Sequence, residues 1–260
     1  MTTSTTHTIP STSTEQAIQT EQKRPRDLDN WAHSANPVFH AMNMPSSALN
    51  QIEGKQITGP LRGFGPLWQK TYWVELPTSS VSARDLVSAW KANFPSFWPK
   101  GNNFYAPLTG IAPGEVALIN MDVPGGLKLS TGVMVLYSDE EQFSFITPEG
   151  HMLAGWITFS GFEKAGQTIA QAQVLVRAPD PLMELLLRFG GYAQEDKFWK
   201  QTLSSVARHF GIEVESSMRK ICVDRRIQWS QVRNIRHNLI IRSTFYFLAA
   251  PARWVRNRKA

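Results

Sequence analysis

A run of five strand-like segments between residues 115 and 178 places the strongest constraint on the fold of this chain. The segments are residues 115–121, 127–137, 142–147, 152–162 and 168–178, and turn signals such as VPGG, SDEE, PEG and EKAGQ separate them. The gaps hold at most five residues, whereas a crossover between parallel strands needs about a dozen or more. Neighbouring strands must therefore pair antiparallel, which predicts a meander that forms one curved sheet.

A further strand and a short helix precede this run. Apolar and polar residues alternate from residue 69 onward, as in a strand with one buried face. The predicted apolar face consists of Trp68, Tyr72, Val74 and Leu76. The stretch SARDLVSAWKANF then predicts a helix that Ser82 caps and that ends before Pro95.

A helical pattern replaces the alternation after residue 178. Asp180 can cap a helix whose first position is Pro181. Its predicted apolar stripe consists of Leu182, Leu185, Leu186 and Phe189. After an interruption at two glycines, the pattern resumes with Phe198, Trp199, Thr202, Leu203, Val206 and Phe210 and stops at Gly211. Two such stripes need a sheet face to bury them, so the expected fold class is α+β, with a curved antiparallel sheet around a long C-terminal helix.

This order of elements resembles the START-like superfamily, also called SRPBCC, helix-grip or birch-pollen-allergen-like. The resemblance covers about residues 68–211, and GHMLAGWITFSGF, QAQVLVRAPDP and EDKFWKQTLSSVARHFG look like the last two strands and the closing helix of bacterial members. In that superfamily the sheet wraps around the long helix and leaves an apolar cavity for lipids, sterols or polyketides. Such spaces between sheet and helix are typical small-molecule sites.

The resemblance implies a ligand-binding interior lined by the inward faces of the strands and by the helix. The expected ligand-binding residues are Trp98, Tyr105, Met134, Trp156, Thr158, Trp199, Leu203 and Val206. The expected function is to bind, carry or sense a hydrophobic small molecule or lipid. The alternative is a cyclase or dehydratase type of enzyme, which needs inward-facing polar groups within reach of one another. A third interpretation is an interaction module whose own aromatic rings fill the interior.

Six polar residues are candidates for chemistry in such an interior: Tyr105, Tyr137, Gln171, Gln173, Arg177 and Glu195. Gln171, Gln173 and Arg177 alternate with small aliphatic residues, so they are solvated if the aliphatic face points inward. Glu195 and Asp196 stand near the start of a helix, where carboxylates complement the helix dipole. Adjacent helical residues diverge by about 100°, which argues against a converging carboxylate pair.

The stretch FITPEGHMLAGW sets an acid and an imidazole two residues apart. Pro148 and Gly150 suit a tight three-residue hairpin turn, with the positive φ at the glycine. We therefore interpret Glu149 and His151 as solvent-facing turn residues whose pKa values burial does not shift.

The net charge of +6 is unevenly distributed. Residues 216–260 hold eleven Lys or Arg and one acid, whereas the first 215 residues hold 16 bases and 20 acids. A basic extension on an acidic body suggests an anionic partner. Three interpretations stay open: the extension packs on the body or on a second copy in a homo-oligomer, it lies on an anionic membrane surface, or, with the least support, it binds nucleic acid.

Several site classes find no support in the sequence. The chain has a single cysteine, Cys222, and no two of its six histidines are three or four residues apart. Both observations argue against a metal site. Phosphate-loop, dinucleotide and nucleophile-elbow motifs are absent, so no cofactor is expected. Without a signal peptide or an apolar run of membrane-spanning length, we expect a cytoplasmic protein that is peripheral at most.

The expected organisation has four parts. Residues 1–30 form a disordered Ser/Thr-rich tail, residues 31–66 a lead-in arm, residues 67–212 the helix-grip domain, and residues 213–260 a helical basic extension.

Overall fold

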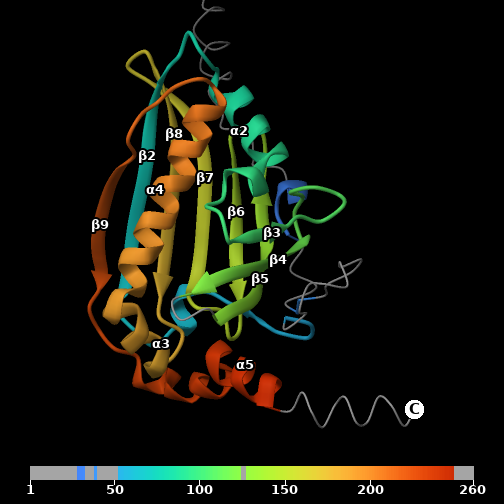
Figure 1. Cartoon of the computed structure of the whole chain (residues 1–260), viewed down its shortest axis with the longest axis vertical. Helices are drawn as coiled ribbons and strands as arrows, with labels where there is room; N and C mark the ends of the chain where they lie inside the picture. Colours follow the sequence, from blue (N-terminus) through green and yellow to red (C-terminus); the bar gives the residue numbers. More distant parts are fainter. Residues whose placement is uncertain (1–27, 33–37, 40–51, 124–126, 249–260) are drawn as a thin grey trace, which may run out of the picture.

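One large antiparallel sheet carries the long helix α4 on one of its faces (Figure 1). This computed structural model describes residues 28–32, 38–39, 52–123 and 127–248. The sheet order is β3-β4-β5-β6-β7-β8-β2-β9, and β1 pairs with β6. The strands are β1 (Ile57–Thr58), β2 (Leu67–Pro77), β3 (Asn103–Tyr105), β4 (Val116–Val123), β5 (Leu127–Ser138), β6 (Gln142–Pro148), β7 (Ala154–Lys164), β8 (Gln167–Arg177) and β9 (Ser217–Asp224). The predicted meander corresponds to β4 to β8, and all its pairings are antiparallel.

Two helices cover one face of the sheet. They are α2 (Ala83–Ala92), which the Ser82 side chain caps as predicted, and α4 (Tyr192–His209). A short 3₁₀ helix, η3 (Phe94–Phe97), lies between α2 and β3. The second predicted helical stripe is confirmed, because Thr202, Leu203 and Val206 of α4 are fully buried against the sheet. This side, which we call the helix face, holds the larger apolar core.

The opposite face, which we call the outer face, has a core of its own. Phe39 and Ile52 of the N-terminal arm are buried there against Leu118, Met134 and Ile146 of the strands. The arm also contributes β1 and η2 (Pro60–Arg62), and η1 (Leu28–Asn30) directly precedes it. Central strands such as β5 therefore bury side chains on both faces. The predicted disordered tail lies outside the described residues except for 28–30.

The helical segment that precedes α4 differs from the prediction. Asp180 caps α3 (Pro181–Leu186) by accepting the Met183 N–H, and η4 (Leu187–Gly191) then kinks at Gly190, where φ is 109°. The predicted stripe points the wrong way, because Leu185, Leu186 and Phe189 are exposed whereas Met183 and Leu187 are buried. The helix packs instead through Met183 and Leu187, which form a small core with Ala178.

The C-terminal extension also differs from the expected helix. It begins with β9, which adds an edge strand to β2 of the sheet. The 3₁₀ helix η5 (Trp229–His237) and the helix α5 (Leu239–Leu248) follow at the lower end of the molecule in Figure 1. No helix within the described ranges has both the length and the apolar character needed to cross a bilayer.

Candidate functional site

A buried cluster of charged groups lies where the start of α4 crosses β2 and β9. Trp68, Lys70 and Tyr72 alternate along β2 toward the helix face. Lys220 of β9 is the cross-strand partner of Lys70, so both lysines share that face. The first turns of α4 bring Tyr192, Glu195 and Asp196 over them. Three elements far apart in the sequence thus supply one site.

The Lys70 ammonium is the centre of this cluster. Its side chain is fully buried, and its Nζ lies 2.7 Å from Glu195 Oε2 and 2.7 Å from Asp196 Oδ1. The Tyr72 hydroxyl donates to the same Asp196 oxygen at 2.6 Å. The Cα–Cβ bonds of Glu195 and Asp196 do point in different directions, but both carboxylates reach the same Lys70 ammonium. The expectation that the two carboxylates do not converge is therefore wrong.

Glu195 carries the least satisfied polar atom of the cluster. Burial raises the pKa of its carboxyl, and the attraction of the Lys70 ammonium works against that rise. Its second oxygen, Oε1, is buried and has no hydrogen-bond partner among the described residues. A raised pKa and an unpartnered oxygen are features of carboxyl groups that exchange protons with a bound ligand.

The Lys220 ammonium lies over aromatic rings, and the Asp196 and Glu195 carboxylates attract it without forming an ion pair with it among the described residues. Its Nζ is 4.1 Å from the centroid of the Trp68 ring and 4.9 Å from that of Tyr192. Burial lowers the pKa of Lys220, and the neighbouring Lys70 ammonium lowers it further. Within the described residues no ion pair is formed by Lys220, which leaves its N–H groups available to an anionic ligand.

A pocket of about 440 Å³ opens beside this cluster. The lining residues are Pro66, Trp68, Glu184, Leu187, Arg188, Gly190, Tyr192, Ala193, Asp196 and Lys220. Its α3 side is fixed by an ion pair, in which Arg188 Nε donates to Glu184 Oε1 at 2.6 Å. The α3–α4 kink therefore forms one wall of the pocket, and the β2–β9 edge forms the other.

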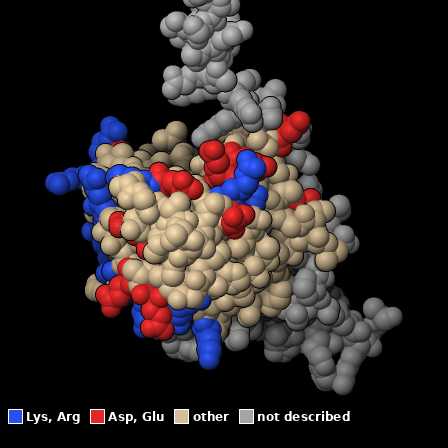
Figure 2. Space-filling model, turned by 90° about the horizontal axis from the view of Figure 1, so that it is seen from above, with Lys and Arg blue, Asp and Glu red and all other residues tan. Residues whose placement is uncertain are grey.

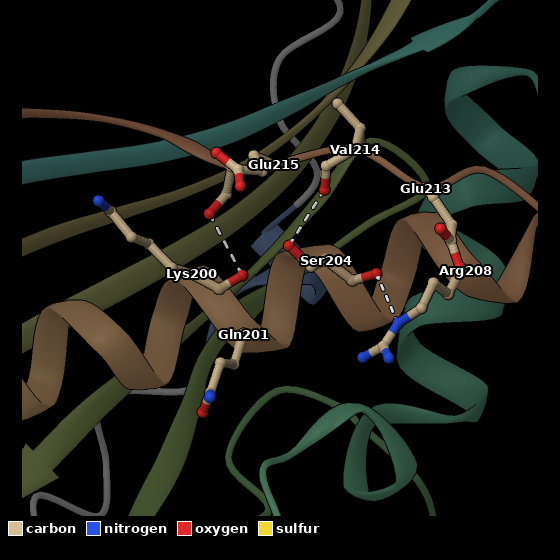
Figure 3. Close-up of a pocket in the computed structure, with 8 residues that line it drawn as sticks. Lys200, Gln201, Ser204, Arg208, Glu213, Val214 and Glu215 are labelled. Atoms are coloured by element: carbon tan, nitrogen blue, oxygen red, sulfur yellow. Dashed lines mark hydrogen bonds between the residues drawn. The ribbon is translucent and has the colours of Figure 1, made fainter.

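A second pocket, of about 610 Å³, lies between α4 and the segment that leads into β9 (Figure 3). Val214 is its single apolar lining residue, and the others are Lys200, Gln201, Ser204, Arg208, Glu213, Glu215 and Ser216. Hydrogen bonds tie its two walls together: Ser204 Oγ donates to Val214 O at 3.2 Å, and Ser216 Oγ donates to Lys200 O at 3.3 Å. Such polar walls suit water better than an apolar ligand.

The expected ligand-binding residues do not come together. Trp98, Trp199, Leu203 and Val206 lie in or against the core on the helix face. Tyr105, Met134 and Trp156 belong to the outer-face core, and Thr158 bonds Ser144 across neighbouring strands on that same face. The sheet itself separates the two groups, so these eight residues cannot line a single cavity.

Aromatic rings occupy the space between the sheet and the two helices. Phe159 is fully buried, and its ring centroid lies 4.9 Å from that of Phe143, 5.1 Å from Phe94 and 5.5 Å from Trp199. Neither pocket described above extends into this space. The third interpretation of the sequence, an interior filled by the chain's own rings, therefore describes this part of the core.

The other candidates for chemistry lie elsewhere. The aliphatic face of β8 points to the helix face, so Gln171 and Gln173 are half-buried on the outer face. Tyr105 packs in the outer-face core, and Tyr137 contacts Trp31 of the arm. Arg177 is buried as an anchor: it donates to Asp224 at 2.6 Å and to the Gly65 carbonyl at 3.0 Å. Of the six candidates only Glu195 takes part in the cluster at Lys70.

The acid and imidazole of the β6–β7 turn do not form a site. The turn is longer than predicted, but Gly150 does take a positive φ of 82°. His151 is 8% exposed, not solvent-facing, because η5 covers the turn: a Cβ at Gly150 would lie 2.3 Å from the His237 carbonyl oxygen. The His151 Nδ1 accepts the Leu153 N–H at 3.0 Å. Burial lowers the pKa of His151 to about 4, so the interpretation of an unshifted imidazole is wrong.

A pH dependence of stability follows from His151. Its folded-state pKa of about 4 lies below the unfolded value near 6.5. The unfolded chain therefore binds the proton more readily, and the stability present above pH 6.5 is lost as the pH falls toward 4. We expect the unfolding free energy from guanidinium titrations at pH 7 and pH 5 to fall more for the native chain than for His151→Asn. Equal losses in both proteins would contradict a buried neutral His151.

Comparisons with known proteins complete the description. No family model matches the sequence, and no curated protein matches it. Similar solved structures include a START superfamily protein from Mycobacterium smegmatis, with 18% identity over 56% of this chain and 99% of that chain and a TM-score of 0.39. They also include Ara h 8.0201, with 12% identity over 55% of this chain and 97% of that chain and a TM-score of 0.41.

A third similar structure is the di-domain ARO/CYC StfQ from the steffimycin biosynthetic pathway, with 10% identity over 56% of this chain and 53% of that chain and a TM-score of 0.40. Likenesses of this size carry neither a substrate nor an activity to this protein. The fold is assigned from the topology itself. A large open antiparallel sheet that holds the long helix α4 against one face gives this chain a helix-grip α+β fold.

Proposed function

We propose that this chain binds an amphiphilic small molecule, with an apolar body and an anionic head group, in the pocket beside the α3–α4 kink. The observation that carries the proposal is the Lys220 ammonium, which lies over two aromatic rings at the pocket wall with no carboxylate partner among the described residues. The pocket volume of about 440 Å³ falls within the range of small-molecule sites, about 300–1,000 Å³.

The two parts of the ligand would meet different walls. Trp68, Leu187 and Tyr192 offer the apolar surface against which a hydrocarbon or aromatic body can pack. The Lys220 N–H groups would bond the anionic head, and Arg188 at the kink would add a second cation. A neutral head group would gain the apolar contacts but not the ionic ones. The ligand class is therefore a lipid-like or aromatic acid.

Replacing Lys220 with methionine tests this assignment. Methionine keeps most of the side-chain volume and removes the charge, whose hydrogen bond to an anion is worth about 1.5–3 kcal/mol. We expect Lys220→Met to weaken decanoate binding about 10- to 100-fold in isothermal titration calorimetry and to leave decanol binding unchanged. The matched control is Lys200→Met in the pocket of Figure 3, which should bind both ligands like the native chain.

Two outcomes would overturn the proposal: binding of neither decanoate nor decanol by the native chain, or equal effects of Lys220→Met and Lys200→Met. Organic extraction of the purified protein followed by mass spectrometry would identify a natural guest. A guest with a carboxylate or phosphate head would support the ligand class, and a neutral or cationic guest would contradict it.

A second candidate function is acid–base catalysis on a ligand in the same pocket. One observation favours it: the buried Oε1 of Glu195 has no partner among the described residues, and burial raises the pKa of this carboxyl. A rise in pKa moves a carboxyl group toward the range in which general acids work. Chemical conversion of the extracted guest during incubation with the protein would favour catalysis over simple binding.

A further inference from the structure

Several elements at the lower end of the molecule in Figure 1 carry exposed apolar side chains. Twelve large apolar side chains are exposed among the described residues, and seven of them lie on η2, on α3 with its kink, and on η5. These seven are Leu61, Leu185, Leu186, Phe189, Trp229, Val232 and Ile235. Phe189 is 82% exposed and Leu61 76%. Apolar groups gathered in this way mark an interaction surface.

The three elements that carry these side chains are fastened to one another. The Asn234 amide of η5 donates to the Arg62 carbonyl of η2 at 2.8 Å and to the Pro179 carbonyl before α3 at 3.0 Å. The Trp229 ring of η5 packs edge-on against the Phe64 ring at 5.3 Å. We call the surface formed by residues 61–62, 185–189 and 225–236 the basic apolar end. It is one connected part of the folded chain, although its segments lie up to about 170 residues apart.

The charged side chains of this end are almost all basic. Arg62, Arg225, Arg233 and Arg236 are exposed, and no carboxylate of the described residues pairs with them in an ion pair. Of the acids nearby, Glu184 is buried and Asp224 half-buried, and both already pair with arginines. The half-buried Glu149 lies near His237 at the end of η5. The opposite end, seen from above in Figure 2, carries Asp and Glu side chains beside its Lys and Arg side chains. The positive field is thus concentrated at the lower end.

We propose that the basic apolar end docks onto an anionic lipid surface. Arginines there would be attracted to the negative head groups, and Leu61, Phe189 and Trp229 would insert among the upper acyl chains. Charge complementarity selects an anionic partner, and the exposed apolar side chains select a bilayer over a nucleic acid. Phosphate contacts alone require no exposed phenylalanine or leucine. The proposal stands independently of the ligand pocket.

Vesicle sedimentation with the full chain tests this docking. Phosphatidylcholine vesicles with one-quarter phosphatidylserine should pull down the native protein at low salt, and pure phosphatidylcholine vesicles should do so much less. The double variant Arg233→Ser/Arg236→Ser should weaken binding about 30-fold, at about fivefold for each arginine near the surface. The matched control Arg84→Ser/Arg208→Ser removes the same charge at the upper end and should change binding little.

Two further variants test the contribution of the exposed apolar side chains to vesicle binding. Phe189→Ser should weaken binding to the anionic vesicles at least tenfold, because an inserted aromatic side chain returns to water. Leu108→Ser removes a side chain that is 88% exposed outside this end and should bind like the native protein. Circular dichroism checks that all variants stay folded. A double arginine variant and a Phe189 variant that both lose binding would support docking through charge and insertion together.

Three results would overturn the proposal. Equal binding to neutral and anionic vesicles would remove the role of the arginines. Tight binding of a 20-nucleotide single strand or duplex, measured by fluorescence anisotropy, without any vesicle binding would assign this end to nucleic acid. Dimerisation that Phe189→Ser abolishes in analytical ultracentrifugation, without vesicle binding, would assign it to a second copy of the chain.

Discussion

Lys70→Met is expected to lower the free energy of unfolding at pH 7 by about 3–5 kcal/mol, the usual cost of removing one partner from a buried ion pair. The native ammonium compensates two carboxylates at 2.7 Å in a place where its own side chain has no access to water. Without it, Glu195 and Asp196 face each other across a space that the methionine fills with apolar atoms. Urea unfolding of both proteins measures the loss.

The pH dependence and the partner variants distinguish charge from packing. Without the Lys70 ammonium, burial and the neighbouring Asp196 carboxylate would raise the folded-state pKa of Glu195 further above its unfolded value, with only Lys220 opposing them. The deficit of Lys70→Met should therefore shrink as the pH falls from 7 toward 5. The triple variant Lys70→Met/Glu195→Gln/Asp196→Asn should recover most of the loss.

As a control, Arg84→Met breaks an exposed ion pair with Glu140 and should cost at most about 1 kcal/mol. A similar small loss for Lys70→Met would contradict the buried cluster.

The strands of this fold were predictable because the signals are local. Turn residues and two-residue alternation located β4 to β8 within about two residues, and the short gaps required antiparallel pairing. The Ser82 and Asp180 caps were predictable for the same reason, since each bonds an N–H three residues ahead. The packing side of α3 was not predictable, because it is set by contacts with residues far away in the sequence, such as Met152 and Ile240.

Local alternation could not decide which face of a strand looks toward the helices. The N-terminal arm buries the outer face, so apolar residues such as Met134 and Trp156 occur on both sides of the central strands. A pattern of this kind gives no preference between inside and outside. That is why half of the expected ligand-binding residues lie on the face opposite α4.

The candidate site depended on contacts that only the fold supplies. A lysine at position 70 falls on the predicted buried face of its strand, between Trp68 and Tyr72, and this was a signal that sequence reasoning overlooked. Its partner Glu195 is 125 residues away in the sequence. The sequence predicts that Lys220 belongs to a helical extension, whereas it lies on a strand that pairs with β2. Buried charges of this kind become visible once the strand order is known.

Phe159→Ala should remove about 3–5 kcal/mol of stability, because it empties a ring-sized space in the helix-face core. The Phe159 side chain contacts the rings of Trp90, Phe94, Phe143, Phe145 and Trp199, with centroid distances between 4.9 and 5.9 Å. These neighbours come from three helical elements, α2, η3 and α4, and from the strand β6, so they cannot all move inward to close the gap. The control on the same strand, Phe162→Ala, removes a ring that is 38% exposed and should cost clearly less.

The same variant tests whether the interior of this helix-grip fold is filled or hollow. A cavity lined by apolar rings stays dry and accepts small aromatic molecules, so benzene or indole should raise the melting temperature of Phe159→Ala through binding to the folded state alone. The native chain should show no such rise, since its own rings already occupy the space. A loss below about 1 kcal/mol in Phe159→Ala, or an equal rise for the native chain, would instead mean that free volume remains between α4 and the sheet. In that event the ligand would bind between α4 and the sheet, and the pocket at the kink would be the entrance to that space.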